Sequence, residues 1–469
     1  MRFVVTSGFL LAVLAVAEAQ VADEQALPPA PGRRVVSVTP APGEFNGPSI
    51  AINPANPQQI VVAFGSRVTV DYSADAGEHW AMSEGTAPTN YRASGDISVT
   101  YDHQGHAILC FIAFDGAGSW RYWGHNPKRN SIQIRRSLDG GKTWEPRTIP
   151  VIEHAEGPGI PFEDKPYVVA DNQAKSPYAG NLYVGWTEDR TADSLILFSR
   201  STDGGLTWSA PMRISDRPGT PRDDEGTVQG FSGVVTPDGA LHVIWSDRGH
   251  IVYAVSRDGG RTFSRNHWVA EAGPSNFMVF NANHANGYPQ IDMAVDKVGK
   301  AGKNGGPARL YVAWNDYRNG DVDIFCASSM DGGRTWAPPV RVNSDPLHNG
   351  ADQLFQWLAV DPASGAVNVV FYDRRRDPAN KTVDVTLARS TDGARTFRNY
   401  LLSEHSYDPL DSEIGEYTAL AALGGRVYGS WMEVVSQPGS SSPAGGNSRT
   451  ASVIHIGTAD FRSPGTGPK

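Results

Sequence analysis

The sequence predicts an all-β protein, a seven-bladed β-propeller built from four-stranded antiparallel blades. Two observations lead to this prediction. The 469 residues include 50 Gly and 33 Pro, with 10% aromatic and 19% charged residues, which is typical of many short strands joined by tight turns. Such a composition disfavours disordered chains and helical bundles. In addition, one pattern of strands and turns recurs with a period of about 62 residues.

Residues 1–19 are expected to be a cleaved signal peptide, because Arg2 precedes an apolar run and Ala17-Glu18-Ala19 has the small residues of a cleavage site. No later stretch is long and apolar enough to span a membrane. We therefore expect a secreted or periplasmic protein. Residues 20–32 are expected to form a flexible leader, residues 33–461 one propeller domain, and residues 462–469 a loose tail.

The recurring turn has the pattern Ser-x-Asp-x-Gly-x-Thr-Trp/Phe. Copies, some of them imperfect, begin at Ser73, Ser137, Ser201, Ser256, Ser329 and Ser390. A short Asp side chain accepts backbone N–H bonds within such a turn, and Gly permits the positive φ that it needs. A turn that is copied around a fold cannot bring every copy to one site, so we interpret the six Asp residues as structural.

The strands around these turns complete the repeat. A short apolar strand lies upstream of each turn, a second strand follows it, and each unit then holds four strands, as a propeller blade does. Seven inner strands predict seven blades, six of which carry the turn. The last blade, at about residues 412–461, lacks it, and we expect the segment RRVVSVTP near residues 33–40 to complete this blade and close the ring.

Charge and cysteine content narrow the function further. The net charge of −9 offers no basic surface for nucleic acid or anionic lipid. Cys110 and Cys326 lie mid-strand and far apart in the chain, so we expect two separate buried thiols.

The six turns match the Asp-box, or BNR, motif, and the chain resembles the sialidase superfamily over essentially its whole mature length. The resemblance implies that the boxes lie opposite the functional face. That face would be made by the loops that lead into the inner strands and the loops that follow the second strands. Polar residues where the inner strands begin are Asp96, Glu163, Asp164, Lys165, Gln290, Asp292, Gln356, Glu416 and Tyr417. Those after the second strands are Glu188, Arg190, Asp247, Arg248, Asp316, Arg318, Asp373 and Arg374.

Sialidases use a Tyr nucleophile, a Glu that takes its proton, an Asp acid/base and three Arg that grip the substrate carboxylate. The resemblance implies Tyr417 as nucleophile, with Asp96 or Asp164 as acid/base and Glu188 or Glu225 as the group that activates Tyr417. The substrate-binding residues would be Lys165, Arg190, Arg248, Gln290, Asp292, Arg318, Gln356, Arg374 and Glu416. The repeated Asp-Arg and Asp-x-x-Arg pattern also allows these arginines to form salt bridges within their own blades.

The chain departs from the family in two respects. The segment NGPSIAI stands where the family has an Arg-Ile-Pro segment, and sialidases have six blades where seven are predicted here. The function expected first is a sialidase-like glycoside hydrolase that acts on terminal sugars of glycans, acidic ones included.

Two other functions stay open. One is a polysaccharide lyase or another glycosidase that uses a loop histidine, and the candidates are His154, His284, His348 and His405. The other is a non-catalytic glycan-binding propeller. No cofactor or metal is expected. The expected partner is a glycan, without nucleic acid or membrane, and the expected state is a monomer.

Overall fold

The computed structural model describes residues 27–462, except positions 66, 87, 89 and 224 and the segments 273–290, 298–306, 410–416 and 436–450. The predicted signal peptide and most of the predicted leader and tail therefore lie outside the described residues. Within the described ranges, no helix has the length and apolar character needed to cross a bilayer.

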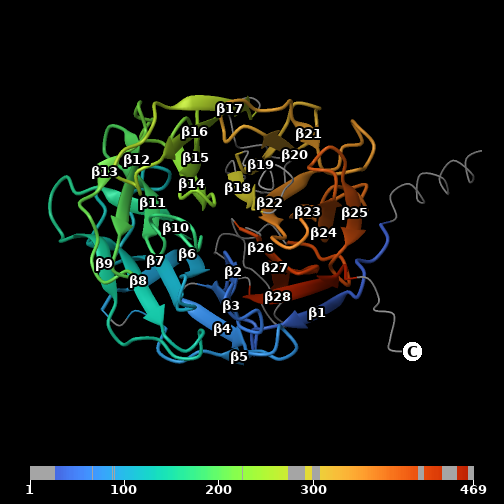
Figure 1. The fold of residues 1–469 in the computed structure, drawn as a ribbon, viewed down its shortest axis with the longest axis horizontal. Coiled ribbons are helices and arrows are strands. Elements are labelled where there is room, and N and C mark those ends of the chain that lie inside the picture. The colour runs from blue at the N-terminus through green and yellow to red at the C-terminus, as the bar shows by residue number, and fades with distance from the viewer. Residues whose placement is uncertain are drawn as a thin grey trace, which may run out of the picture.

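Seven four-stranded antiparallel sheets surround a central axis, which confirms the predicted fold (Figure 1). The first four blades, inner strand first, are β2(Ser49–Ile52) to β5(Ala81–Met82) through β3(Ile60–Phe64) and β4(Thr69–Ser73); β6(Ala93–Tyr101), β7(Ala107–Phe114), β8(Asn130–Ser137) and β9(Ile149–His154); β10(Phe162–Ala170), β11(Leu182–Asp189), β12(Ser194–Ser201) and β13(Met212–Arg213); and β14(Val228–Val235), β15(Leu241–Asp247), β16(His250–Ser256) and β17(His267–Glu271). The last three are β18(Ile291–Asp296), β19(Arg309–Asp316), β20(Asp323–Ser329) and β21(Val340–Arg341); β22(Gln353–Val360), β23(Val367–Asp373), β24(Asp384–Ser390) and β25(Arg398–Leu401); and β26(Ala419–Leu423), β27(Arg426–Val435), β28(Ala451–Asp460) and β1(Arg34–Ser37).

The ring closes as predicted, because the N-terminal strand β1 is the outer strand of the last blade. It pairs with β28 from Arg34 opposite Thr458 to Ser37 opposite His455, and Figure 1 shows blue β1 beside red β28. The segment before it is also attached. The N–H of Ala30 donates to the carbonyl of Leu401 at 3.0 Å, and that of Leu401 to Pro28 at 2.8 Å. The packed chain thus begins before residue 33, because the leader residues 28–30 bond to the exposed edge of β25.

The six predicted turns lie between the third and outer strands of their blades and share one set of hydrogen bonds. In the fourth blade, the Ser256 hydroxyl donates to Asp258 at 2.8 Å and accepts the N–H of Gly260 at 2.9 Å. Asp258 also accepts the N–H of Thr262 at 2.9 Å. The turns also contact the neighbouring blade, since the Tyr253 hydroxyl donates to the carbonyl of Gly332 at 3.2 Å. The six Asp residues are thereby used within the scaffold, as the sequence predicts.

Each blade interior is apolar. The second strands of four blades bury Trp186, Trp245, Trp314 and Trp431 almost completely. Cys110 and Cys326 are free and buried, as predicted, and burial raises the pKa of the Cys326 thiol to about 12. These thiols are therefore packing groups.

Side chains of the inner strands tie neighbouring blades together around the axis. The Ser49 hydroxyl accepts the N–H of Val99 at 3.1 Å, and the Ser98 hydroxyl accepts that of Val168 at 3.0 Å. On the other side of the ring, Asp292 accepts the N–H of Leu358 at 2.9 Å. These bonds hold the starts of the inner strands in a fixed arrangement around the channel.

Candidate active site

Four inner strands carry a β-bulge at the same depth, where each enters the central channel. The ladder register shifts in β6, β10, β14 and β22. Each bulge has one residue with positive φ, namely Asp96 at 44°, Lys165 at 48°, Gly230 at 75° and Phe355 at 51°. The left-handed conformation costs a residue with a side chain about 1–2 kcal/mol. Strain of this kind is often concentrated at functional sites, so the bulged channel wall is a candidate site.

A pocket of about 630 Å³, including space open to solvent, lies at these bulges. Its wall is formed by Pro48, Ser49, Asp96, Ile97, Ser98, Lys165, Pro166, Tyr167, Gln229, Gly230, Phe231, Ser232, Ile291, Trp357 and Tyr417. The structure therefore brings Asp96, Lys165 and Tyr417, all predicted site residues, to one cavity. Lys165 is the cationic side chain among the described residues of this wall.

The Tyr417 ring packs against the first blade. A Cβ atom added to Gly47 would lie 3.1 Å from this ring, and Gly47 has a φ of +52°. Gly47 belongs to the NGPSIAI segment, which stands where the family has an Arg-Ile-Pro segment. At this point of the pocket, a glycine makes room for the tyrosine ring.

Asp96 and Asp164 form a carboxyl pair at the bulge. Burial raises the pKa of Asp164 to about 7, Lys165 opposes this shift, and the negative charge and hydrogen bond of Asp96 add to it. The Lys165 ammonium lies 3.6 Å from the Asp164 carboxylate. Because two neighbouring carboxyl groups cannot both ionise easily, the pair retains a proton close to neutral pH.

A further carboxyl group, missed by the sequence analysis, lies behind Asp164. Asp189 is only 2% exposed, and burial together with the charges of Asp164 and Asp223 holds its pKa well above the usual range. Asp223 in turn accepts a hydrogen bond from the indole N–H of Trp123 at 2.7 Å. The only sequence signal for Asp189 was its place at the end of β11, next to Glu188.

The aromatic wall of the pocket was also missed. The rings of Tyr167 and Trp357 lie 5.9 Å apart, and Phe231 completes this side. These residues follow the bulges directly, and in the sequence they resemble ordinary strand residues.

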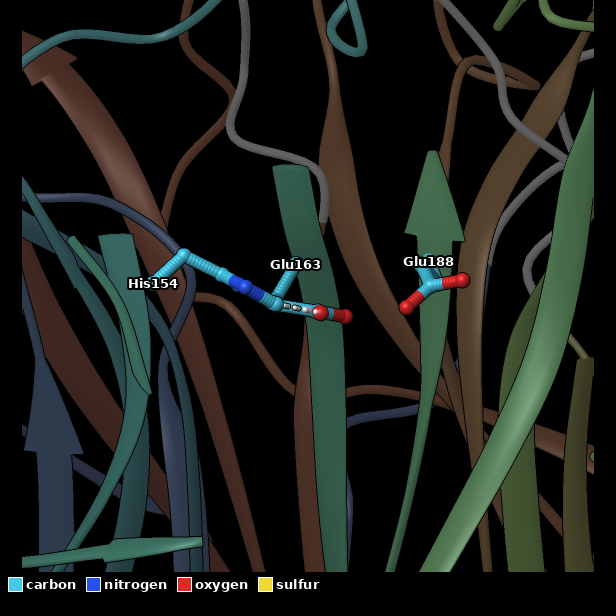
Figure 2. Close-up of side chains that lie close together, drawn as sticks. All are labelled: His154, Glu163 and Glu188. Atoms are coloured by element: carbon cyan, nitrogen blue, oxygen red, sulfur yellow. Dashed lines mark hydrogen bonds and ion pairs between the residues drawn. The ribbon is translucent and has the colours of Figure 1, made fainter. Parts of the chain in front are cut away.

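Glu188 lies outside the pocket wall, so its predicted role as the base that activates Tyr417 is not supported. Its carboxylate pairs with the Arg190 guanidinium at 2.6 Å, and it groups with His154 and Glu163, as Figure 2 shows. The pleat explains the separation, because Glu188 is the cross-strand partner of Glu163, whereas Asp164, the next residue, faces the other way. The alternative base, Glu225, pairs with Arg222 at 2.9 Å.

The predicted arginine clamp is not formed by the rim arginines, because each one pairs with a carboxylate near its own strand end. Arg248 lies 2.8 Å from Asp247, and Arg318 lies 2.5 Å from Asp316. Arg190 pairs with Glu188, as above, and Arg374 is 2% exposed with its guanidinium 4.0 Å from Asp352. The structural interpretation of the repeated Asp-Arg pattern therefore holds for these four residues.

The remaining predicted site residues do not line the pocket either. Asp292 is 1% exposed and accepts bonds from Ser232 and from the backbone of Leu358, which makes it a tie between blades. Gln356 is fully buried, and its amide donates to the Ala313 carbonyl. Gln290 and Glu416 lie outside the described residues.

The candidate histidines of the lyase hypothesis are also away from the described pocket wall. His154 bonds to Glu163, His405 bonds to Glu433 at 3.0 Å, and His348 is exposed. His284 lies outside the described residues.

Buried carboxyl groups predict an unusual dependence of stability on pH. Burial raises the pKa of Asp71, of Asp164 and of Asp292 to about 7, whereas in an unfolded chain they titrate near 4. Between these pH values the folded chain binds more protons, so unfolding becomes easier as pH rises. Buried His242, whose pKa is lowered to about 4, opposes this with a single group. We expect a higher Tm at pH 5 than at pH 8.

Thermal unfolding monitored by circular dichroism at the two pH values measures this difference. Asp71→Asn, in the first blade and away from the pocket, should reduce it. A Tm at pH 8 that equals or exceeds the Tm at pH 5 would contradict the assignment.

The comparisons with known proteins agree with the predicted class. No family model matches the chain. A curated sialidase from Bacteroides fragilis is 23% identical to it, over 35% of this chain and 36% of that protein, so the match spans about a third of the relative's length. Together with the seven-bladed fold, this similarity defines a sialidase-like β-propeller.

Solved structures with similar folds include glycan-processing enzymes. The Hadza microbial sialidase Hz136 is 17% identical, with a TM-score of 0.48 over 86% of this chain and 73% of that one. An α-L-arabinofuranosidase from Fusarium graminearum is 13% identical, with a TM-score of 0.45 over 79% of this chain and 94% of that one.

Proposed function

We propose that the protein is a glycoside hydrolase that removes a terminal, acidic sugar from glycans in its central pocket. One observation carries the proposal: Asp96, Lys165 and Tyr417 line the same cavity, and Asp96 shares a hydrogen bond with the buried Asp164. This combines a proton donor, a cation and a potential nucleophile within one site.

The carboxyl pair supplies the acid. A carboxyl group that keeps its proton near pH 7 can donate it to the leaving oxygen of a glycosidic bond, and raised pKa values are the usual means to this end. Asp96 lines the pocket, and Asp164 lies buried behind it, 5% exposed. We assign Asp96 as the group that meets the substrate and Asp164 as the residue that helps to hold the proton.

Lys165 determines the substrate class. Since the rim arginines are occupied by carboxylates, the ammonium group of Lys165 is the cation that the described pocket wall offers to an acidic sugar. An ammonium binds a carboxylate as a point charge, without the two parallel bonds of a guanidinium. The site therefore suits an acidic sugar held by one strong contact, and Tyr167 and Trp357 provide apolar surface beside it.

Tyr417→Phe tests the nucleophile. The pocket places Tyr417 with Asp96, and a tyrosine nucleophile is the exception that sialidases make among glycosidases. We expect the variant to fold and to lose activity by about 100-fold or more in kcat, because it removes an interaction made in the transition state. Undiminished turnover would exclude Tyr417 as nucleophile.

An activity screen tests the function itself. The purified protein should release the fluorophore from a methylumbelliferyl sialoside or glucuronide, or shorten oligosaccharides that end in a uronic acid. Product with an unsaturated sugar would identify a lyase instead. If the folded protein binds such glycans without product, the pocket is a binding site and the hydrolase proposal is wrong.

A further inference from the structure

Three potential metal ligands meet at the boundary between the second and third blades, outside the central pocket. His154 is the last residue of β9, Glu163 the second residue of β10, and Glu188 the last but one of β11. One ligand atom of each lies within 4.8 Å of the others. Figure 2 shows the His154 ring directed at the Glu163 carboxylate, with the Glu188 carboxylate on the other side.

The backbone places these three side chains together. Glu163 and Glu188 are direct cross-strand partners, so their side chains leave the same face of the sheet. His154 reaches across from the neighbouring blade, and its Nε2 lies 2.6 Å from Glu163 Oε1. The three residues therefore link two blades.

Donors outside the trio orient both carboxylates. The indole N–H of Trp186 donates to Glu163 Oε2 at 2.5 Å, and the guanidinium of Arg190 donates to Glu188 Oε1 at 2.6 Å. In metal sites, partners of this kind hold the ligating carboxylates in position. Glu163 is completely buried, whereas the His154 side chain is 20% exposed, which leaves an approach for an ion from the His154 side.

We propose that His154, Glu163 and Glu188 bind one divalent transition-metal ion, Zn²⁺ or Mn²⁺. A neutral imidazole with carboxylate oxygens suits these ions, whereas Ca²⁺ prefers oxygen ligands alone. Three protein ligands leave further positions for water. The bound ion joins the outer strand of the second blade to the inner strand of the third, and it fixes the residue next to Asp164.

Isothermal titration of chelator-treated protein with ZnCl₂ and with MnCl₂ tests the proposal, and this readout does not depend on enzymatic activity. We expect one ion per chain, tighter binding than CaCl₂ and a higher Tm with the ion present. His154→Ala and Glu188→Gln should each weaken binding at least about 10-fold. Both side chains are partly exposed, so these variants are better suited than substitutions of the buried Glu163.

Glu153→Gln is the matched control. Glu153 precedes His154 on β9, is exposed, and accepts a bond from Tyr91 at 2.7 Å, so its variant should bind the ion as the wild type does. The proposal is overturned if the wild type takes up neither ion at about 1 mM. It is also overturned if His154→Ala and Glu188→Gln bind as tightly as Glu153→Gln.

Discussion

Asp96→Asn is expected to lower kcat for glycoside hydrolysis by about 10²–10⁴-fold while leaving the fold intact. Asp96 lines the pocket with Tyr417 and shares a hydrogen bond with Asp164, and an amide cannot transfer the proton that the leaving group needs. Asparagine tolerates the left-handed backbone conformation that Asp96 adopts, at a φ of 44°. The substitution therefore removes the acid without disturbing the bulge.

Steady-state kinetics and the pH profile separate the two carboxyl groups. Asp164→Asn leaves Asp96 beside a neutral amide, which removes the negative charge that makes the pair hold its proton. The basic limb of kcat/KM should then move to lower pH. Asp296, a buried carboxyl at the far end of the inner strand β18, provides the matched control as Asp296→Asn. Unchanged kcat in Asp96→Asn would exclude Asp96 as the acid.

Arg375→Met is expected to destabilise the protein by about 3–5 kcal/mol, the usual effect of removing one partner from a buried ion pair. Arg375 is 3% exposed, and its guanidinium lies 2.6 Å from Asp373 and 3.7 Å from Asp345. It also donates to Asn399 at 3.0 Å. Methionine fills much of the volume but leaves two buried carboxylates without this cation.

Urea unfolding of Arg375→Met and Arg34→Met measures the difference. Arg34 pairs with Glu78 at 2.7 Å, but both side chains are about half exposed, at 46% and 55%. Such surface pairs contribute about 0–1 kcal/mol, so Arg34→Met should be close to neutral. A loss of less than about 1 kcal/mol in Arg375→Met would show that the network between the fifth and sixth blades is not a source of stability.

The ring and its closure were predictable because their signals are local and repeated. Each Asp box specifies its own turn through Ser, Asp and Gly, and the strand near residues 33–40 was the remaining partner for a last blade without a box. The meeting of Asp96, Lys165 and Tyr417 was also predictable. All three stand where an inner strand begins, and in a propeller these points converge on the axis.

Side-chain direction was not predictable from the same pattern. Glu163 and Asp164 are neighbours, yet the pleat directs one to His154 and the other to Asp96. Within the run Arg374-Arg375-Arg376, the sequence offers no sign that Arg375 closes a buried network. The bulges were missed as well, because three of the four have Asp, Lys or Phe at the position where glycine would have marked them.

The most direct test of the proposed active site is to trap the intermediate on Tyr417. A fluorinated analogue of the sugar that the protein releases slows the second step of a retaining hydrolase, so the glycosyl-enzyme accumulates. Peptide mapping by mass spectrometry should find the sugar on the peptide that contains Tyr417, and no label in Tyr417→Phe. A label on another residue, or inversion of the anomeric centre without any covalent adduct, would contradict the account.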